Sequence, residues 1–289
     1  MSPSGRARAD SELVRRGLFP SRARAQAAIL AGQVFVDGRP ISKAGELVPV
    51  DAPIEVRADP VPYASRGGLK LAHALDALGL DVAGRVALDV GASTGGFTDV
   101  LLRRGARRVY AVDVGYGQLA WSLRQDPRVT AFERTNARYL EPGLFPEPPD
   151  VATVDVSFIS VRKLLPALSR VLIDPADVVV LVKPQFEAGR ERVGKGGIVR
   201  DPRVQVEVMH DLAQAAGEYG LVVRGVTYSP VPGGGGPGGN LEFFQWWSRR
   251  RDGQLEGERL AAAIQHVVRV AWERVAGTAV PVGPLDGSR

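Results

Sequence analysis

The stretch that decides the fold of this chain is Arg85-Val-Ala-Leu-Asp-Val-Gly-Ala-Ser-Thr-Gly-Gly-Phe-Thr98. An apolar run typical of a buried strand leads directly into a turn with three glycines, and a helix is expected to follow. Glycines allow the main chain to approach a ligand closely, and the N–H groups at the start of the helix point toward that ligand. The stretch therefore predicts a pocket for a nucleotide-type cofactor.

The spacing of these glycines narrows the choice of cofactor. The order is Asp-x-Gly-x-x-x-Gly-Gly, whereas dinucleotide sites carry Gly-x-Gly-x-x-Gly. The next apolar run, 108–113, ends in Asp113, where an acid can accept hydrogen bonds from ribose hydroxyls. The pattern favours adenosine without a pyrophosphate.

Beyond residue 64, expected strands alternate with expected helices. Continuous apolar runs such as Val178-Val-Val-Leu-Val182 suit strands that are covered on both faces. This alternation predicts the α/β class, with a Rossmann-like, mostly parallel seven-stranded sheet that binds ligands at the C-terminal ends of its strands. The expected strands are 86–90, 108–113, 129–133, 151–155, 177–183, 221–228 and 241–247.

The first 56 residues form a separate, small α+β unit. A helix is expected over 8–19, a second helix over 23–30 after a cap at Ser21, and two short extended pieces joined by the tight-turn pair Asp37-Gly38. The patterns Leu-Val-x-Arg-Gly-Leu, Ser-Arg-x-x-Ala-Gln and Ala-Gly-x-Val-x-Val-Asp-Gly occur in this order and resemble the S4-type RNA-binding domain. We expect this domain over 1–56, a linker over 57–63, the α/β domain over 64–275 and a disordered tail over 276–289.

Basic residues are concentrated in the N-terminal unit. The whole chain carries a formal net charge of +5, and between Arg6 and Lys43 eight basic residues stand against three acidic ones. Such a concentration indicates a polyanionic partner such as RNA. We expect four arginines, at 15, 16, 22 and 24, to lie on adjacent solvent-facing helical turns. The residues expected to contact RNA are Arg6, Arg8, Arg15, Arg16, Arg22, Arg24 and Arg66.

The composition also argues against several other classes of protein. The chain has no cysteine and three histidines, which are not at metal-ligand spacing, so neither disulfides nor a metal site is expected. The N-terminus lacks a signal-like apolar segment, and the longest strongly apolar run is too short to span a bilayer. We expect a soluble, cytoplasmic, monomeric protein that does not bind a membrane.

Four charged residues stand at the ends of expected elements. Lys70 enters a helix, Asp155 and Lys183 each end a strand, and Glu242 opens one. Taken singly, each has an ordinary explanation, such as a helix-terminal charge, a cap or an edge-strand charge. Because strand ends of one sheet face one crevice, together they predict a cluster of two lysines and two carboxylates beside the cofactor turn.

Several motifs resemble those of the TlyA (hemolysin A) family, in which an S4-type domain precedes a methyltransferase domain similar to the FtsJ/RrmJ ribose methyltransferases. The resemblance extends to about residue 270. It implies S-adenosylmethionine-dependent 2′-O-methylation of ribosomal RNA within ribosomal subunits, with cytidine in 16S or 23S rRNA as the substrate. The motifs are Asp89 to Thr98, Glu133-Arg-Thr-Asn-Ala-Arg138, Asp155-Val-Ser-Phe-Ile-Ser160, Val182-Lys-Pro-Gln-Phe-Glu187, Gly194-Lys-Gly-Gly-Ile-Val-Arg200 and Asn240-Leu-Glu242.

The same resemblance implies that Lys70, Asp155, Lys183 and Glu242 form a catalytic tetrad. A ribose hydroxyl is a poor nucleophile, so either its proton must be removed or its developing charge must be stabilised, and a lysine can do both. We expect Lys183 to take the central role. As a neutral base it would need a depressed pKa, which the neighbouring Lys70 favours and the two carboxylates oppose. Lys70 and Asp155 would orient it, and Glu242 would position the hydroxyl or a lysine.

The residues expected to bind the cofactor lie mostly in the glycine turn. Asp89 either orients the turn or meets the methionine ammonium group, and Asn136 either contacts the adenine edge or forms a turn. Ser93 and Thr94 either contact the methionyl end or cap the helix. The full expected set is Asp89, Gly91, Ser93, Thr94, Gly95, Gly96, Asp113 and Asn136.

Three other functions remain as alternatives. Methyltransferases acting on exocyclic amines carry Asn/Asp-Pro-Pro-Tyr/Phe where this chain has Asp155-Val-Ser-Phe158, without either proline. A non-catalytic RNA-binding assembly factor would not need Lys183 or the glycines. A membrane-lytic protein would need a spanning segment or a strongly amphipathic apolar helix.

One feature of the chain departs from the family pattern. The loop 230–240 is longer and richer in glycine than the corresponding loop of the family.

Overall fold

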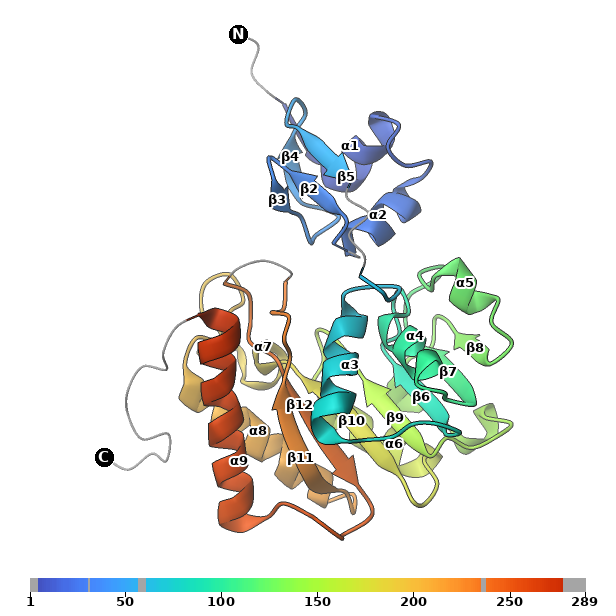
Figure 1. Ribbon diagram of the computed structural model, residues 1–289, viewed down its shortest axis with the longest axis vertical. Helices are drawn as coiled ribbons and strands as arrows, with labels where there is room; N and C mark the ends of the chain where they lie inside the picture. The colour runs from blue at the N-terminus through green and yellow to red at the C-terminus, as the bar shows by residue number, and fades with distance from the viewer. Residues whose placement is uncertain (1–4, 31, 57–60, 235–237, 278–289) are drawn as a thin grey trace.

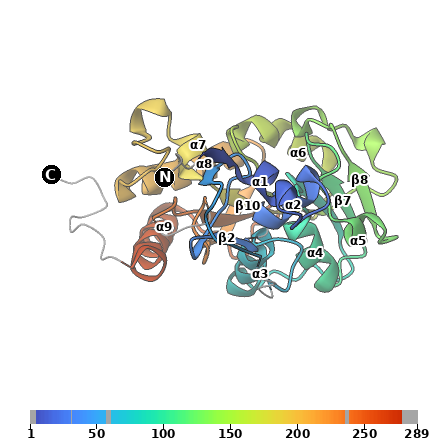
Figure 2. The ribbon, with the colours of Figure 1, turned by 90° about the horizontal axis from the view of Figure 1, so that it is seen from above.

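The computed structural model describes residues 5–30, 32–56, 61–234 and 238–277. A small N-terminal domain lies above a larger α/β domain (Figure 1), and seen from above its helices lie over the middle of the larger domain (Figure 2). The predicted linker 57–63 and tail 276–289 lie partly outside the described residues, as does the centre of the loop 230–240.

The N-terminal domain contains two short sheets and two helices. Its elements are β1 (Arg6–Arg8), α1 (Ala9–Arg15), α2 (Arg22–Leu30), β2 (Val34–Val36), β3 (Arg39–Pro40), β4 (Leu47–Pro49) and β5 (Ile54–Val56). β1 pairs with β4, and β2 lies between β3 and β5. Asp37 and Gly38 both take a positive φ, 50° and 73°, which lets the chain turn tightly between β2 and β3. The Ser21 hydroxyl accepts a hydrogen bond from the Arg24 amide at 3.3 Å and so caps α2, as predicted.

Within the described residues, the larger domain has one seven-stranded sheet, which confirms the predicted α/β fold. β10, β9, β6, β7 and β8 run parallel, and β12 is antiparallel to both of its neighbours. The strands, in their order across the sheet, are β11 (Val222–Tyr228), β12 (Phe243–Ser248), β10 (Asp177–Val182), β9 (Val151–Val154), β6 (Val86–Val90), β7 (Arg108–Val112) and β8 (Val129–Phe132).

The order of the strands places the ligand crevice. The chain adds β7 and β8 on one side of β6 and then returns to place β9 on the other side. The connections therefore diverge at the C-terminal ends of β6 and β9, and ligands bind at such a switch point in open α/β sheets.

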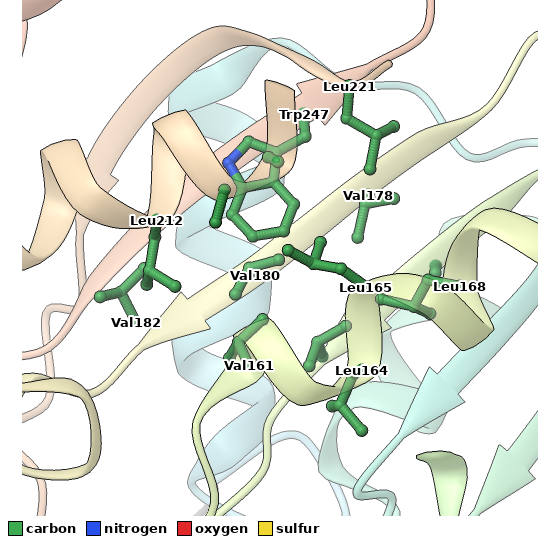
Figure 3. Packing of buried hydrophobic residues seen from close by; sticks show 14 of the residues in the cluster. Val161, Leu164, Leu165, Leu168, Val178, Val180, Val182, Leu212, Leu221 and Trp247 are labelled. Atoms are coloured by element: carbon green, nitrogen blue, oxygen red, sulfur yellow. The ribbon is translucent and has the colours of Figure 1, made fainter. Parts of the chain in front are cut away.

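Helices cover both faces of the sheet. On one face α3 (Gly67–Leu78), α4 (Gly96–Arg103) and α5 (Trp121–Arg124) bury residues such as Leu75 and Leu101. On the other face α6 (Leu165–Val171), α8 (Pro202–Gly217) and α9 (Gly257–Ala271) do the same. Figure 3 shows Val178 and Trp247 of the sheet against Leu165 of α6. The remaining short helical turns are η1 (Ala137–Tyr139), η2 (Pro142–Leu144), η3 (Val161–Leu164), α7 (Pro184–Glu187), η4 (Arg190–Arg192) and η5 (Trp272–Ala276).

The described residues contain neither a membrane-spanning helix nor a group of metal ligands. No helix there is both long and apolar enough to cross a bilayer. Nor do three or more His, Cys, Asp or Glu side chains in that part of the chain form a group that could hold a metal ion.

Candidate active site

The glycine turn after β6 is shaped by its neighbours. Gly91 has a φ of +86°, and a Cβ atom there would lie 2.2 Å from the carbonyl oxygen of Asp155. A side chain at this position would therefore separate the ends of β6 and β9. Gly95 also has a positive φ, but its missing Cβ faces the side chains of Leu119 and Leu123.

A cavity of about 520 Å³ lies between this turn and the ends of β7 and β9. The Asp113 carboxylate stands in its wall and accepts hydrogen bonds from the amides of Ser93, at 2.8 Å, and Gly115, at 2.7 Å. Each carboxylate oxygen can accept a further bond, so ribose hydroxyls can still bind. Val114, Ile159 and other apolar side chains complete the wall. The size, the apolar walls and the carboxylate fit an adenosyl group.

Two of the residues expected to bind the cofactor, Asp89 and Gly95, line neither this cavity nor the adjoining one that Thr94 and Gly96 line. Asp89 is fully buried within β6, where it accepts hydrogen bonds from the hydroxyls of Thr98, at 2.7 Å, and Thr153, at 3.0 Å. Burial raises the pKa of Asp89 to about 7. Its contacts agree with a role in orienting the turn and not with the expected contact to a methionine ammonium group. Gly95 packs against α5, and so it too lies away from the cavity.

A second cavity, of about 240 Å³, lies beside the first. Gly91, Ser93 and Asp155 line both cavities. The second cavity is also lined by Thr94 and Gly96 of the turn and by Ser65, Arg66 and Lys70 around the start of α3. Leu30 and Ser42 of the N-terminal domain complete part of its wall. The two cavities thus meet at Asp155.

The structure brings the four charged residues together as two ion pairs. Lys70 Nζ lies 2.6 Å from Glu242 Oε2, and Lys183 Nζ lies 2.5 Å from Asp155 Oδ1. Lys70 is in the first turn of α3, Asp155 and Lys183 directly follow β9 and β10, and Glu242 directly precedes β12. Glu242 is also close enough to Lys183 to affect its pKa, so the two pairs form one cluster.

The charge of Lys183 follows from competing effects. Burial lowers the pKa of its ammonium group, but Asp155 and Glu242 outweigh this effect and the net shift is upward. Lys183 is therefore a cation in this state, and the depressed pKa that a neutral base would need is not found. Lys183 Nζ also donates a hydrogen bond to Ser157 Oγ at 2.9 Å, a partner that the sequence interpretation missed.

The loop after β9 holds further residues that the sequence interpretation missed. Phe158 lines the larger cavity, is 91% exposed and has a φ of +65°, a conformation that bulky residues rarely adopt. Glu187 accepts hydrogen bonds from the Ser160 hydroxyl, at 2.6 Å, and the Val161 amide, at 2.8 Å, and so ties this loop to the segment after Lys183. Left-handed backbone at a phenylalanine leaves no signal in the sequence.

Asn136 lies in the wall of the larger cavity and makes a local turn. Its side-chain oxygen accepts a hydrogen bond from the Arg138 amide at 3.1 Å. The side-chain amide nitrogen of Asn136 makes no hydrogen bond within the described residues. The local turn and a hydrogen bond to adenine are therefore compatible at this position.

The arginines predicted to bind RNA lie in four different environments. Arg6 and Arg24 are exposed and make no side-chain bond within the described residues. Arg8, Arg15 and Arg22 are exposed but paired with acids of α1. Arg16 was expected to face solvent, and this is wrong: its guanidinium donates to the carbonyls of Val50 and Ala52 and to Glu12. Arg66 lines the second cavity, and burial lowers its pKa.

This fold and these adjoining cavities define a Rossmann-like methyltransferase that is joined to a second, small domain. The sequence profile of the FtsJ-like methyltransferase family matches residues 63–246, and that of the S4 domain matches residues 8–54. The chain therefore belongs to the TlyA family, whose members join an S4 domain to an FtsJ-like methyltransferase domain that uses S-adenosylmethionine.

Its relatives cover nearly the whole chain. It is 48% identical to the 16S/23S rRNA (cytidine-2′-O)-methyltransferase TlyA of Mycobacterium tuberculosis, over 91% of this chain and 97% of that protein. It is 45% identical to the putative rRNA methyltransferase YqxC of Bacillus subtilis, over 94% and 98%. A putative hemolysin from Streptococcus thermophilus, 42% identical, superimposes with a TM-score of 0.72 over 94% of this chain and 98% of that one.

Proposed function

We propose that this chain methylates the ribose 2′-oxygen of a cytidine in 16S or 23S ribosomal RNA, with S-adenosylmethionine as the methyl donor. One observation carries the proposal: two lysine–carboxylate pairs form one cluster beside an adenosyl-sized cavity and its neighbour, with Asp155 in the wall of both cavities and Lys70 in the wall of the second. The printed activity of the M. tuberculosis relative supports the choice of cytidine in rRNA.

In this proposal the larger cavity holds the adenosyl part of the cofactor. Asp113 accepts from the ribose hydroxyls, and Asn136 lies toward the adenine edge. Gly91, Ser93 and Thr94 approach the methionyl part with main chain and hydroxyls. When bound, S-adenosylmethionine supplies a sulfonium methyl group, whose carbon bonds to the ribose oxygen as its bond to sulfur breaks.

The tetrad acts on the attacking oxygen. Because its pKa is raised, Lys183 donates a hydrogen bond as an ammonium group and stabilises the negative charge that develops on the oxygen. Asp155 holds Lys183 at the junction of the cavities, and the hydroxyl proton leaves toward this carboxylate. Lys70 fixes Glu242, whose carboxylate orients the hydroxyl. Lys183 thus provides the electrostatic stabilisation, and Lys70 acts through Glu242.

The N-terminal domain would bring the RNA to this site. Exposed arginines give it an electrostatic contact surface for phosphates, and Leu30 and Ser42 place it beside the second cavity. We propose that the chain acts on ribosomal subunits in the cytoplasm. We also propose that it acts as a monomer, because one chain supplies both cavities and all four charged residues.

Transfer of labelled methyl groups to ribosomal subunits tests the proposal. The purified protein, labelled S-adenosylmethionine and subunits from a strain lacking the enzyme should give label in alkali-resistant dinucleotides, since a 2′-O-methyl group blocks alkaline cleavage. Label on bases would contradict ribose methylation.

Variants at two lysines separate the catalytic role from general charge. Lys183→Ala should lower the rate of transfer by about 10²- to 10⁴-fold at unchanged cofactor affinity. Lys163→Ala, at an exposed lysine of η3, removes the same charge and should leave the rate unchanged. Full turnover by Lys183→Ala would remove Lys183 from the chemistry.

A further inference from the structure

The basic surface of the N-terminal domain is built around two buried acids. The side chains of Asp10 and Glu12, in the first turn of α1, have 0% exposed area. A carboxylate is costly to bury unless hydrogen-bond donors satisfy it. Here most of those donors are arginines, and three of them, Arg8, Arg15 and Arg22, keep about half or more of their side-chain surface exposed.

Asp10 joins two of these arginines. Arg8 donates from Nε, at 3.0 Å, and Nη2, at 2.9 Å, to its two oxygens. Arg22 donates from Nη2 at 3.0 Å, and Gln26 donates from Nε2 at 2.7 Å. These donors, Arg8 first, hold the pKa of Asp10 well below its usual range. Arg8 and Arg22 nevertheless keep 49% and 56% of their side-chain surface exposed, so both remain accessible while they are bound to Asp10.

Glu12 holds a third exposed arginine. Arg15 donates from Nε at 2.8 Å and from Nη2 at 2.5 Å, and its side chain is 63% exposed. Arg16 donates to the same carboxylate and to two backbone carbonyls of the segment after β4, so Glu12 is itself fixed to the domain. Hydrogen bonds from Arg15, and secondarily from Arg16, lower the pKa of Glu12 to about 2.

We propose that Asp10 and Glu12 are positioning residues that hold Arg8, Arg22 and Arg15 as a preorganised surface for RNA phosphates. The inference rests on the proposed function and adds a partner-binding role to two acids. An unanchored arginine loses rotamer freedom when it binds, whereas these three have already lost it on folding. A guanidinium fork of fixed orientation also matches a phosphate better than a free one.

A positioning role for Asp10 and a purely electrostatic role predict opposite changes in RNA affinity when Asp10 is neutralised. Neutralising an acid within a basic surface adds one positive charge, and screened electrostatics alone would then strengthen RNA binding. If Asp10 instead orients two phosphate-binding arginines, neutralising it weakens binding. The sign of the change therefore separates positioning from charge.

The matched pair Asp10→Asn and Asp37→Asn tests this sign in the full-length protein. Both variants add one charge to the same domain, but Asp37 lies in an exposed turn at positive φ, where asparagine is well tolerated. Affinity for 23S and 16S rRNA is measured across a salt series. We expect Asp10→Asn to bind about tenfold more weakly, with a salt slope smaller by about one to two phosphate contacts. Asp37→Asn should bind as tightly as wild type or slightly more tightly.

A second pair keeps the inference testable if Asp10→Asn unfolds the domain, which a circular-dichroism melt would reveal. Arg6 and Arg8 lie two residues apart on β1, so they share a face of the strand, but only Arg8 is anchored on an acid. Arg8→Lys and Arg6→Lys both preserve charge. We expect Arg8→Lys to lose several-fold more affinity for rRNA than Arg6→Lys, with the affinity for S-adenosylmethionine unchanged in both.

Each outcome bears on one proposal. Asp10→Asn binding as tightly as Asp37→Asn, or equal losses in the two lysine variants, would overturn the positioning role. Failure of the wild-type protein itself to bind rRNA in a salt-dependent way would instead overturn the proposed function.

Discussion

Lys70 and Glu242 form an ion pair of 2.6 Å across 172 residues of sequence. The pair links the first turn of α3 to the start of the antiparallel strand β12. Because β12 pairs with β10, the Glu242 carboxylate also lies beside Lys183, which directly follows β10. The catalytic cluster is thus a product of the sheet topology, since none of its members are close neighbours in the chain.

Removing one partner of this ion pair leaves the other charge buried and unpaired, so the losses of stability in the two single variants should not add. Both side chains are largely buried, so Lys70→Met or Glu242→Leu alone leaves a buried charge without its partner. We expect each single variant to lower the free energy of unfolding by about 3 kcal/mol, and the double variant by clearly less than their sum. Urea denaturation of the four proteins measures this. Additive losses would mean that the two charges do not stabilise each other.

Gly91→Ala should abolish cofactor binding. The added Cβ would lie 2.2 Å from the Asp155 carbonyl oxygen, so the ends of β6 and β9 must separate and both cavities change. Gly79→Ala is the control, because Gly79 also has a positive φ, +64°, but has open space around its missing Cβ. Calorimetric titration with S-adenosylmethionine should show at least a tenfold loss for Gly91→Ala only. Equal affinities in both variants would show that the close approach is unimportant.

Asp89 should make stability depend on pH. Its folded pKa, raised to about 7 by burial, lies above the unfolded value, so the folded state binds the extra proton between them. The contribution is complete below about pH 4 and is lost as pH rises through about 7, on the order of 4 kcal/mol in all. Asp89→Asn removes this dependence. The free energy of unfolding of Asp89→Asn minus that of wild type should therefore increase from pH 5 to pH 8, and a constant difference would contradict the raised pKa.

The pH dependence of single-turnover methyl transfer should report the charge of Lys183. Because its pKa is raised, a role as a cation predicts a rate that stays level from about pH 8 to 10 and falls when the ammonium group loses its proton. A lysine that has this raised pKa but acts as a neutral base would instead give a rate that rises about tenfold for each pH unit over that range. Rapid-quench measurements with labelled S-adenosylmethionine distinguish the two profiles.

Much of the α/β domain could be predicted from the sequence. β6 and β10 are nearly continuous apolar runs, as expected for strands covered on both faces, and the residues that follow them, Gly91 and Lys183, then fall at one edge. The same alignment of element ends at one crevice predicts that the four charged residues lie together. Parallel strands converge on a common crevice whatever the loops between them do.

What could not be predicted depends on burial and on exact distances. The predicted cluster places two acids and a second lysine around Lys183. The sequence does not show whether burial or the acids have the larger effect on the pKa of Lys183. The burial of Asp10, Glu12 and Arg16 arises from the packing of α1 against β4 and the segment that follows it, which the sequence does not show. Asp89 precedes the glycine turn in sequence, yet the strand pleat turns its side chain into the protein.

Leu30 and Ser42 belong to the N-terminal domain, yet they stand in the wall of the second cavity. A truncated protein that begins at residue 64 would expose this chamber to bulk water, and a chimera carrying a foreign RNA-binding module would enclose it with different side chains. Engineers who wish to redirect such an enzyme to a new transcript must therefore transplant the module together with its contact to the chamber, since the part that finds the target also helps to enclose it.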